Sequence, residues 1–123
     1  MGSMDDILRR SLLFDFYGEL LTDHQKNIYE ASVSEDLSLS EIAAQEGISR
    51  QGVHDLINRT DKILENYEQK LHLVERFLNM KRDLQKIREN AIELDNRLDG
   101  SDTEGKELLK GILEHTDGLI GGL

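Results

Sequence analysis

The sequence predicts an all-α protein, in which a helix-turn-helix domain without a wing is followed by a long helix and a helical hairpin arm. None of the 123 residues is proline, so no helix is interrupted by a missing backbone N–H. Apolar residues recur at helical spacing along most of the chain. Capping signals of the type Ser/Thr-x-x-Glu/Gln precede these periodic stretches. We expect a helix-turn-helix domain over residues 4–62, continuous with a second part over residues 63–123.

Two short helices joined by a tight turn are predicted within residues 37–61. Ser38 and Glu41 form a capping box that begins the first helix. Gly47 can adopt the left-handed conformation that ends a helix, and Ser49 can cap the next one. The second helix then presents one apolar face, made by Val53, Leu56 and Ile57. This order of glycine, apolar residue and serine between two helices is typical of a helix-turn-helix.

Two further helices are predicted before this motif. Asp5 and Asp6 favour a helix start near Met4, because acidic side chains oppose the positive partial charge of a helix N-terminus. Thr22 and Gln25 repeat the capping-box pattern and open a second helix. All four helices can share one small core. Residues 1–3 are expected to be a cloning remnant without function.

The motif's second helix has no stop signal, since residues 53–98 contain neither proline nor glycine. One helix over residues 50–98 would be about 70 Å long at about 1.5 Å per residue. A bend at residues 71–74 is the alternative. Beyond it, apolar residues alternate at spacings of three and four, which predicts a coiled-coil seam. The predicted dimer seam consists of Phe77, Met80, Leu84, Ile87, Ala91, Leu94 and Leu98.

The chain after the seam is predicted to fold back as a hairpin. Asp99 and Gly100 end the long helix, and Ser101 with Glu104 forms a third capping box. Residues 118–123, which include three glycines, should be a frayed tail. The last helix is short and can cover about half of the seam. Either this helix or a second copy must cover the rest, and we expect a homodimer.

Composition and charge limit the possible functions. The net charge is −10, and residues 38–62 are close to neutral, with three basic and four acidic side chains. Long-range attraction to nucleic-acid phosphates should therefore be weak. The chain has no cysteine, its four histidines lack the spacing of metal ligands, and no catalytic motif occurs. We expect a cytoplasmic protein without catalytic residues, cofactor, metal or membrane insertion.

The motif's second helix carries the candidate nucleic-acid-binding residues. With Val53 and Ile57 turned inward, its polar residues face outward. Arginine can bind guanine, glutamine or asparagine can bind adenine, and aspartate can accept from cytosine. The candidates are Ser49, Arg50, Gln51, His54, Asp55, Asn58 and Arg59. The alternative is that these are only solvated polar residues, and a basic group over residues 81–88 is a second, weaker candidate.

Several segments closely resemble the YlxM family of small helix-turn-helix proteins from Gram-positive bacteria. Those segments are 12–18 (LLFDFYG), 20–22 (LLT), 39–43 (LSEIA), 48–55 (ISRQGVHD), 59–60 (RT) and 64–71 (LENYEQKL). The resemblance covers roughly residues 4–78. It implies a helix-turn-helix similar to region four of sigma factors, and a regulatory role linked to the signal recognition particle pathway.

The leading hypothesis is therefore a non-enzymatic regulatory protein that binds nucleic acid, either DNA or the RNA of the signal recognition particle. Proteins of that particle are further candidate partners implied by the resemblance. The alternative is an interaction adaptor, which would bind a protein through the acidic surface and the coiled-coil seam.

Overall fold

The structure is a computed structural model that describes residues 4–123; the expectation for residues 1–3 lies outside this part. The described chain is all-α, as the sequence predicts. Its elements are α1 (Met4–Tyr17), the 3-10 helix η1 (Gly18–Leu20), α2 (Asp23–Val33), α3 (Leu39–Glu46), α4 (Arg50–Leu71), α5 (Leu73–Arg97) and α6 (Thr103–Gly121). Across the described residues, no helix is both long enough and apolar enough to cross a membrane.

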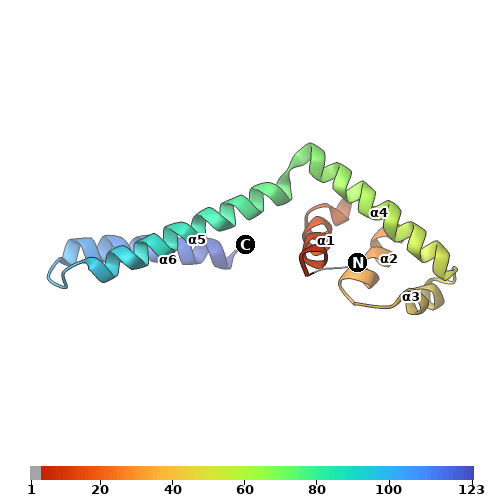
Figure 1. Ribbon diagram of the computed structural model, residues 1–123, viewed down its shortest axis with the longest axis horizontal. Coiled ribbons are helices and arrows are strands. Elements are labelled where there is room, and N and C mark those ends of the chain that lie inside the picture. Colours follow the sequence, from red (N-terminus) through yellow and green to blue (C-terminus); the bar gives the residue numbers. More distant parts are fainter. Residues whose placement is uncertain (1–3) are drawn as a thin grey trace. The chain divides into compact units, whose positions relative to one another are not determined.

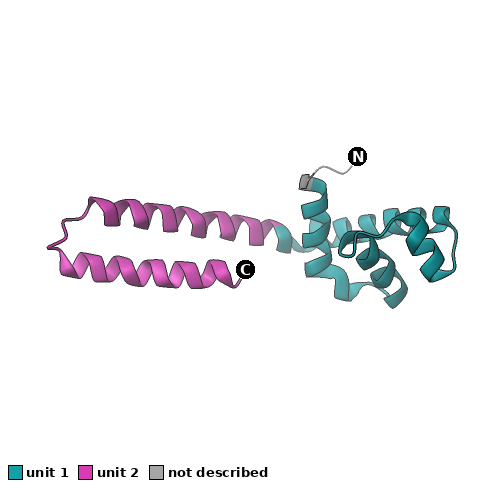
Figure 2. Cartoon of the chain, turned by 90° about the horizontal axis from the view of Figure 1, so that it is seen from below, with its two compact units in different colours: residues 1–74 teal, residues 75–123 magenta. Residues whose placement is uncertain are grey.

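The chain forms two compact units, Met1–Val74 and Glu75–Leu123, which Figure 2 shows in teal and magenta. The division at residue 62 that the sequence suggests stays a prediction.

The first unit is built along α4. Figure 1 shows α1, α2 and α3 gathered along one side of this helix. Their shared core contains one apolar row from each helix, and its fully buried side chains include Leu13, Tyr17, Ile28, Tyr29, Ile42, Val53 and Leu64. Burying such side chains stabilises the fold by roughly 1.5–3 kcal/mol each. The core thus fixes which face of α4 is left to solvent.

The turn between α3 and α4 has the predicted geometry. Ser38 and Glu41 form both hydrogen bonds of the capping box at the start of α3. Gly47 ends α3 with a φ of 69°, and its N–H donates to the carbonyl of Ala43. Ile48 is half-buried against the core. The helix-turn-helix is therefore held by local hydrogen bonds and one apolar residue at its corner.

Polar contacts also join α1 and α2 to α4. Arg9 forms a two-pronged ion pair with Glu65, with N–O distances of 2.7 Å. The hydroxyl of Tyr29 donates to Asp61, which also accepts from Arg10 at 2.9 Å. Burial, followed by this hydrogen bond, raises the pKa of Tyr29. Tyr29 is thus kept as a neutral donor to a carboxylate on α4.

The sequence allowed either one helix over residues 50–98 or a bend at residues 71–74, and the structure has the bend, between α4 and α5. The chain leaves the helix at His72, which has a φ of 57°, inside the range where the sequence allowed a bend. The cause is the buried carboxylate of Glu68. Its Oε1 accepts from the Tyr17 hydroxyl at 2.6 Å and from the backbone N–H of Val74 at 3.0 Å.

Tyr17 completes this arrangement at the start of α5. Its hydroxyl oxygen accepts from the backbone N–H of Leu73 at 3.1 Å. The first N–H groups of a helix have no partner within it, and here two of them bind side chains. Burial and the bond to Glu68 raise the pKa of Tyr17, so its phenol keeps the proton that it donates. Side chains of α1 and α4 thus cap α5.

The second unit is a hairpin of α5 and α6, which run side by side in Figure 2. Ala91, Leu109 and Thr116 are buried between them. Arg88 pairs with Asp117 at 2.6 Å and Lys106 pairs with Asp95 at 3.1 Å. The predicted seam is divided by this packing. Phe77, Leu84, Ala91 and Leu98 are buried or half-buried, whereas Met80, Ile87 and Leu94 are exposed.

Two details at the ends of α6 differ from expectation. Asp102, not Ser101, caps the helix, because its carboxylate accepts from the N–H of Gly105 at 2.9 Å. Residues 118–121 are helical rather than frayed. The buried Thr116 and half-buried Ile120 pack this last part, which offsets the weak helix propensity of its glycines.

The turn can be tested at Gly47. Nothing lies within 4 Å of a Cβ built there, so a side chain meets only backbone strain. We expect Gly47→Val to lower the free energy of unfolding by roughly 1–2 kcal/mol, because β-branched residues tolerate positive φ poorly. Urea denaturation measures this change. Gly47→Asn is the matched control and should cost much less, because asparagine visits this conformation; equal losses in both variants would contradict the explanation.

The capping of α5 can be tested with a double-mutant cycle of Tyr17→Phe and Glu68→Gln. A hydrogen bond to a charged group contributes about 1.5–3 kcal/mol, so the single changes should each destabilise the first unit by about that amount. The double variant should lose clearly less than the sum, because both changes remove the same bond. Additive losses in urea denaturation would show that the two side chains act separately.

Candidate nucleic-acid interface

The candidate residues lie on the exposed side of the N-terminal half of α4. Val53, Ile57 and Thr60 are buried against the core, so the helix must turn its other face outward. Every residue that the sequence suggested is exposed there: Ser49, Arg50, Gln51, His54, Asp55, Asn58 and Arg59. We call these seven residues the α4 face.

Within the α4 face, most polar side chains are held along the helix. Ser49 caps α4, its hydroxyl accepting from the N–H of Gly52 at 2.9 Å. Gln51 donates to Asp55 at 2.9 Å. His54 Nδ1 and Asn58 Nδ2 are 3.4 Å apart. Such pairs four residues apart limit the rotamers of the side chains before any ligand binds.

Sequence reasoning identified these residues but not their pairing. The spacing of four between glutamine and aspartate, and between histidine and asparagine, was the available signal. Ser49 is less available to a ligand than the other residues of the α4 face, because its hydroxyl already accepts the hydrogen bond that caps α4. The remaining six offer donors and acceptors along about two and a half turns of helix.

The charge of the α4 face is small. Arg50 and Arg59 are positive and Asp55 is negative, and the exposed Lys62 follows one turn later. His54 lies 3.9 Å from the Asp55 carboxylate. This mixture resembles a surface that forms directed hydrogen bonds to base edges more than one that binds many phosphates.

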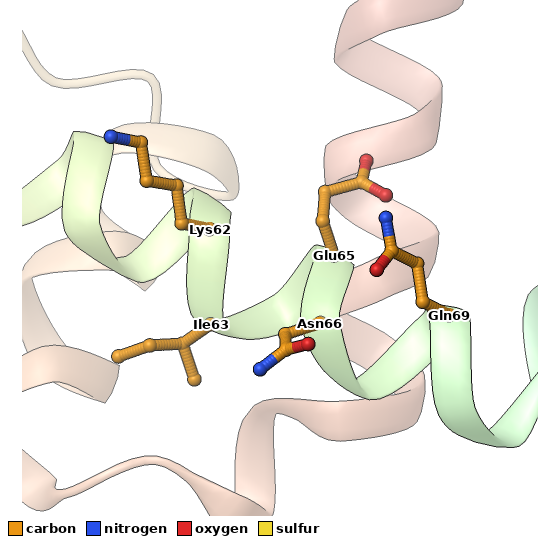
Figure 3. A pocket seen from close by; sticks show the side chains of 5 residues that line it. All are labelled: Lys62, Ile63, Glu65, Asn66 and Gln69. Atoms are coloured by element: carbon orange, nitrogen blue, oxygen red, sulfur yellow. The ribbon is translucent and has the colours of Figure 1, made fainter.

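A surface pocket lies farther along α4, and Figure 3 shows its lining. Its walls come from one helix, with Lys62, Ile63, Glu65, Asn66 and Gln69. Glu65 is already bound by Arg9 on α1. Its lining contains one carboxylate, which is held in this ion pair, and no serine, threonine or cysteine that could act as a nucleophile.

The basic group over residues 81–88 lies on α5 in the second unit. Lys81, Arg82 and Lys86 are exposed, and Arg88 is held by Asp117 of α6. By helical position these four side chains point to different sides of α5, so they do not form one basic patch. Among the residues that the structure describes, no cluster of three histidine, aspartate or glutamate side chains could hold a metal ion.

Comparison with known proteins connects this fold to a family. The family described as "Putative helix-turn-helix protein, YlxM / p13 like" (UPF0122) matches residues 4–102. The chain belongs to the UPF0122 family. The match includes α1–α4 and all of α5, so the helix-turn-helix and the first arm of the hairpin are both family features.

Individual UPF0122 proteins support the same conclusion. The chain is 43% identical over 115 residues to a UPF0122 protein of Desulforamulus reducens, which covers 90% of this chain and 92% of that protein. It is 44% identical over 100 residues to one of Shouchella clausii, covering 77% and 92% of the two chains. It is also 48% identical over 85 residues to one of Caldanaerobacter subterraneus, covering 69% and 73%.

Proposed function

We propose that this protein is a non-enzymatic regulator that binds nucleic acid through the α4 face. Membership of a helix-turn-helix family supports this function, and the observation that carries it is the set of seven exposed residues at the N-terminal half of α4. In DNA-binding helix-turn-helix proteins, this part of the second helix contacts base edges in the major groove.

Duplex DNA is the target that this geometry fits best. The major groove of B-form DNA admits an α-helix and distinguishes all four base pairs. The major groove of an RNA helix is too deep and narrow for side chains to reach the bases. Arg50 and Arg59 would bind guanine or phosphate, Gln51 and Asn58 would bind adenine, and Asp55 would accept from cytosine.

The low charge of the α4 face predicts an unusual salt dependence. If Arg50, Arg59 and Lys62 neutralise about three phosphates, the slope of log K against log salt should be about −3. Such a protein binds random DNA weakly, since non-specific affinity comes almost entirely from phosphate contacts. Its specificity would rest on base contacts, which suits a regulator of few sites.

The proposed pathway follows from the resemblance to the YlxM family, which is linked to the signal recognition particle. The regulated target would then be a component of that pathway. The particle's RNA is the second candidate ligand, and its proteins are candidate partners. Recognition of that RNA would require an unpaired loop or bulge, because the α4 face cannot reach bases in a regular RNA helix.

The test uses duplexes selected from a random pool, with the signal recognition particle RNA as a second ligand. Arg50→Ala with Gln51→Ala should weaken binding about 10- to 100-fold or more, because one good base contact contributes about 1–3 kcal/mol. Fluorescence anisotropy measures the affinity, and circular dichroism checks that helicity is unchanged.

The matched control removes the same two residue types from α5, as Arg82→Ala with Gln85→Ala. Both of these residues are exposed. The control should bind like the unaltered protein. A loss in the control alone would move the site to the basic group over residues 81–88. Unaltered binding by the folded α4 variant would contradict the proposal.

A further inference from the structure

The hairpin of α5 and α6 has two different flanks. On α5, Leu84 and Ala91 face α6, and the residues four positions after them are Arg88 and Asp95. These make the ion pairs with α6, to Asp117 and Lys106. Because a helix turns by about 100° per residue, positions i+3 and i+4 lie on opposite flanks of position i. One flank of α5 is therefore the charged one, joined to α6 by ion pairs.

The residues three positions after Leu84 and Ala91 are Ile87 and Leu94, and Met80 lies one heptad before Ile87. They lie on the other flank and are exposed by 48%, 51% and 49%, respectively. The same rule applies to α6, where the residues three positions after the buried Leu109 and Thr116 are apolar. Those residues are Ile112 and Leu119, exposed by 45% and 58%.

The ion pairs place these two apolar rows on the same side of the hairpin. On α6, the ion-paired Asp117 lies four positions after the half-buried Leu113. On both helices, therefore, the ion-paired residues lie on the flank that is reached four positions after an inward-facing residue. Both i+3 flanks must then lie together on the opposite side. Arg88 pairs with Asp117, and the later Asp95 pairs with the earlier Lys106, so the two helices are antiparallel. Leu94 is therefore level with the first half of α6.

The result is one exposed apolar surface, which we call the hairpin face. It comprises Met80, Ile87, Leu94, Leu108, Ile112 and Leu119, and Leu108 is 71% exposed. The six side chains are each about half exposed or more. At roughly 100 Å² apiece they leave an apolar area on the order of 600 Å² to solvent. This area is at the upper end of the largest apolar patch on a typical monomer, and such patches are often functional.

A second copy of the chain is the partner that the face fits best. Two such faces would bury about 1,200 Å² in total, which reaches the range of specific interfaces. The six residues of the face are uncharged, although the chain carries a net charge of −10. The carboxylates nearest to them are Asp83 on α5 by helical position, and Glu104 and Glu107 on α6, which line a surface pocket with Leu108. Two copies can therefore bring the centres of their faces together without placing like charges in direct contact.

We propose that the hairpin faces of two copies pack against each other, so that two hairpins form a four-helix bundle. Such bundles place apolar rows of antiparallel neighbours around one core. The contact is isologous, since the same surface serves both copies. It uses only the exposed half of the predicted dimer seam, because α6 already covers the other half. This inference does not depend on nucleic-acid binding.

Sedimentation equilibrium of the full chain at micromolar concentrations tests it. The unaltered protein should be a dimer. Ile87→Asp with Ile112→Asp should weaken the dimer about 100-fold or more, because charges replace two central contacts. Gln85→Asp with Asn96→Asp is the matched control, adding the same charge at exposed positions on the opposite side of α5. This control should remain a dimer.

Crosslinking gives a second measurement if the face variant does not fold. The chain has no cysteine, so single variants can be labelled specifically. Ile87→Cys should be joined between copies by a short bifunctional maleimide, and Gln85→Cys should not. A monomeric unaltered protein, a dimer that persists in the folded face variant, or crosslinking from Gln85→Cys alone would each overturn the proposal. If the protein is a monomer, the hairpin face is available to bind a different protein.

Discussion

The first unit depends on one buried carboxylate. Glu68 is nearly inaccessible to solvent, and a buried charge must find donors or the fold loses several kcal/mol. Its donors include the hydroxyl of Tyr17, 51 residues earlier, and the N–H of Val74, beyond the helix end. Satisfying this charge requires α1 to pack on the C-terminal part of α4 and requires the chain to leave the helix at His72. One side chain thus sets both the length of α4 and the closure of the core.

The sequence predicts well those features that depend on residues close together in the chain, such as helix caps and turns. Both capping boxes involve residues three positions apart, and Gly47 adopts the left-handed conformation that its place after α3 demands. The exposed α4 face follows from Val53 and Ile57, since a helix with one buried row must expose the other side. These features need no knowledge of distant contacts. The binding role of the α4 face, in contrast, stays a prediction.

What the sequence could not predict depends on distant contacts. No proline or glycine near His72 breaks the helix. The break coincides with hydrogen bonds that Glu68 and the distant Tyr17 make to the first N–H groups of α5. The one available signal of a buried charge was the position of Glu68, which continues the inward-facing row of Thr60 and Leu64 at a spacing of four residues. The seam has the same limitation. Spacings of three and four show that residues 77–98 form one stripe, but only the ion pairs to α6 decide which half of the stripe stays exposed.

The distribution of aromatic residues has a spectroscopic consequence. The chain has no tryptophan, and its tyrosines, Tyr17, Tyr29 and Tyr67, all lie in the first unit. Near-ultraviolet circular dichroism therefore reports on that unit almost alone, whereas far-ultraviolet signals report on every helix. The two units have separate cores, and the hairpin core has far fewer buried side chains. Melting curves from the two spectral regions need not coincide, so one melting temperature would describe neither unit.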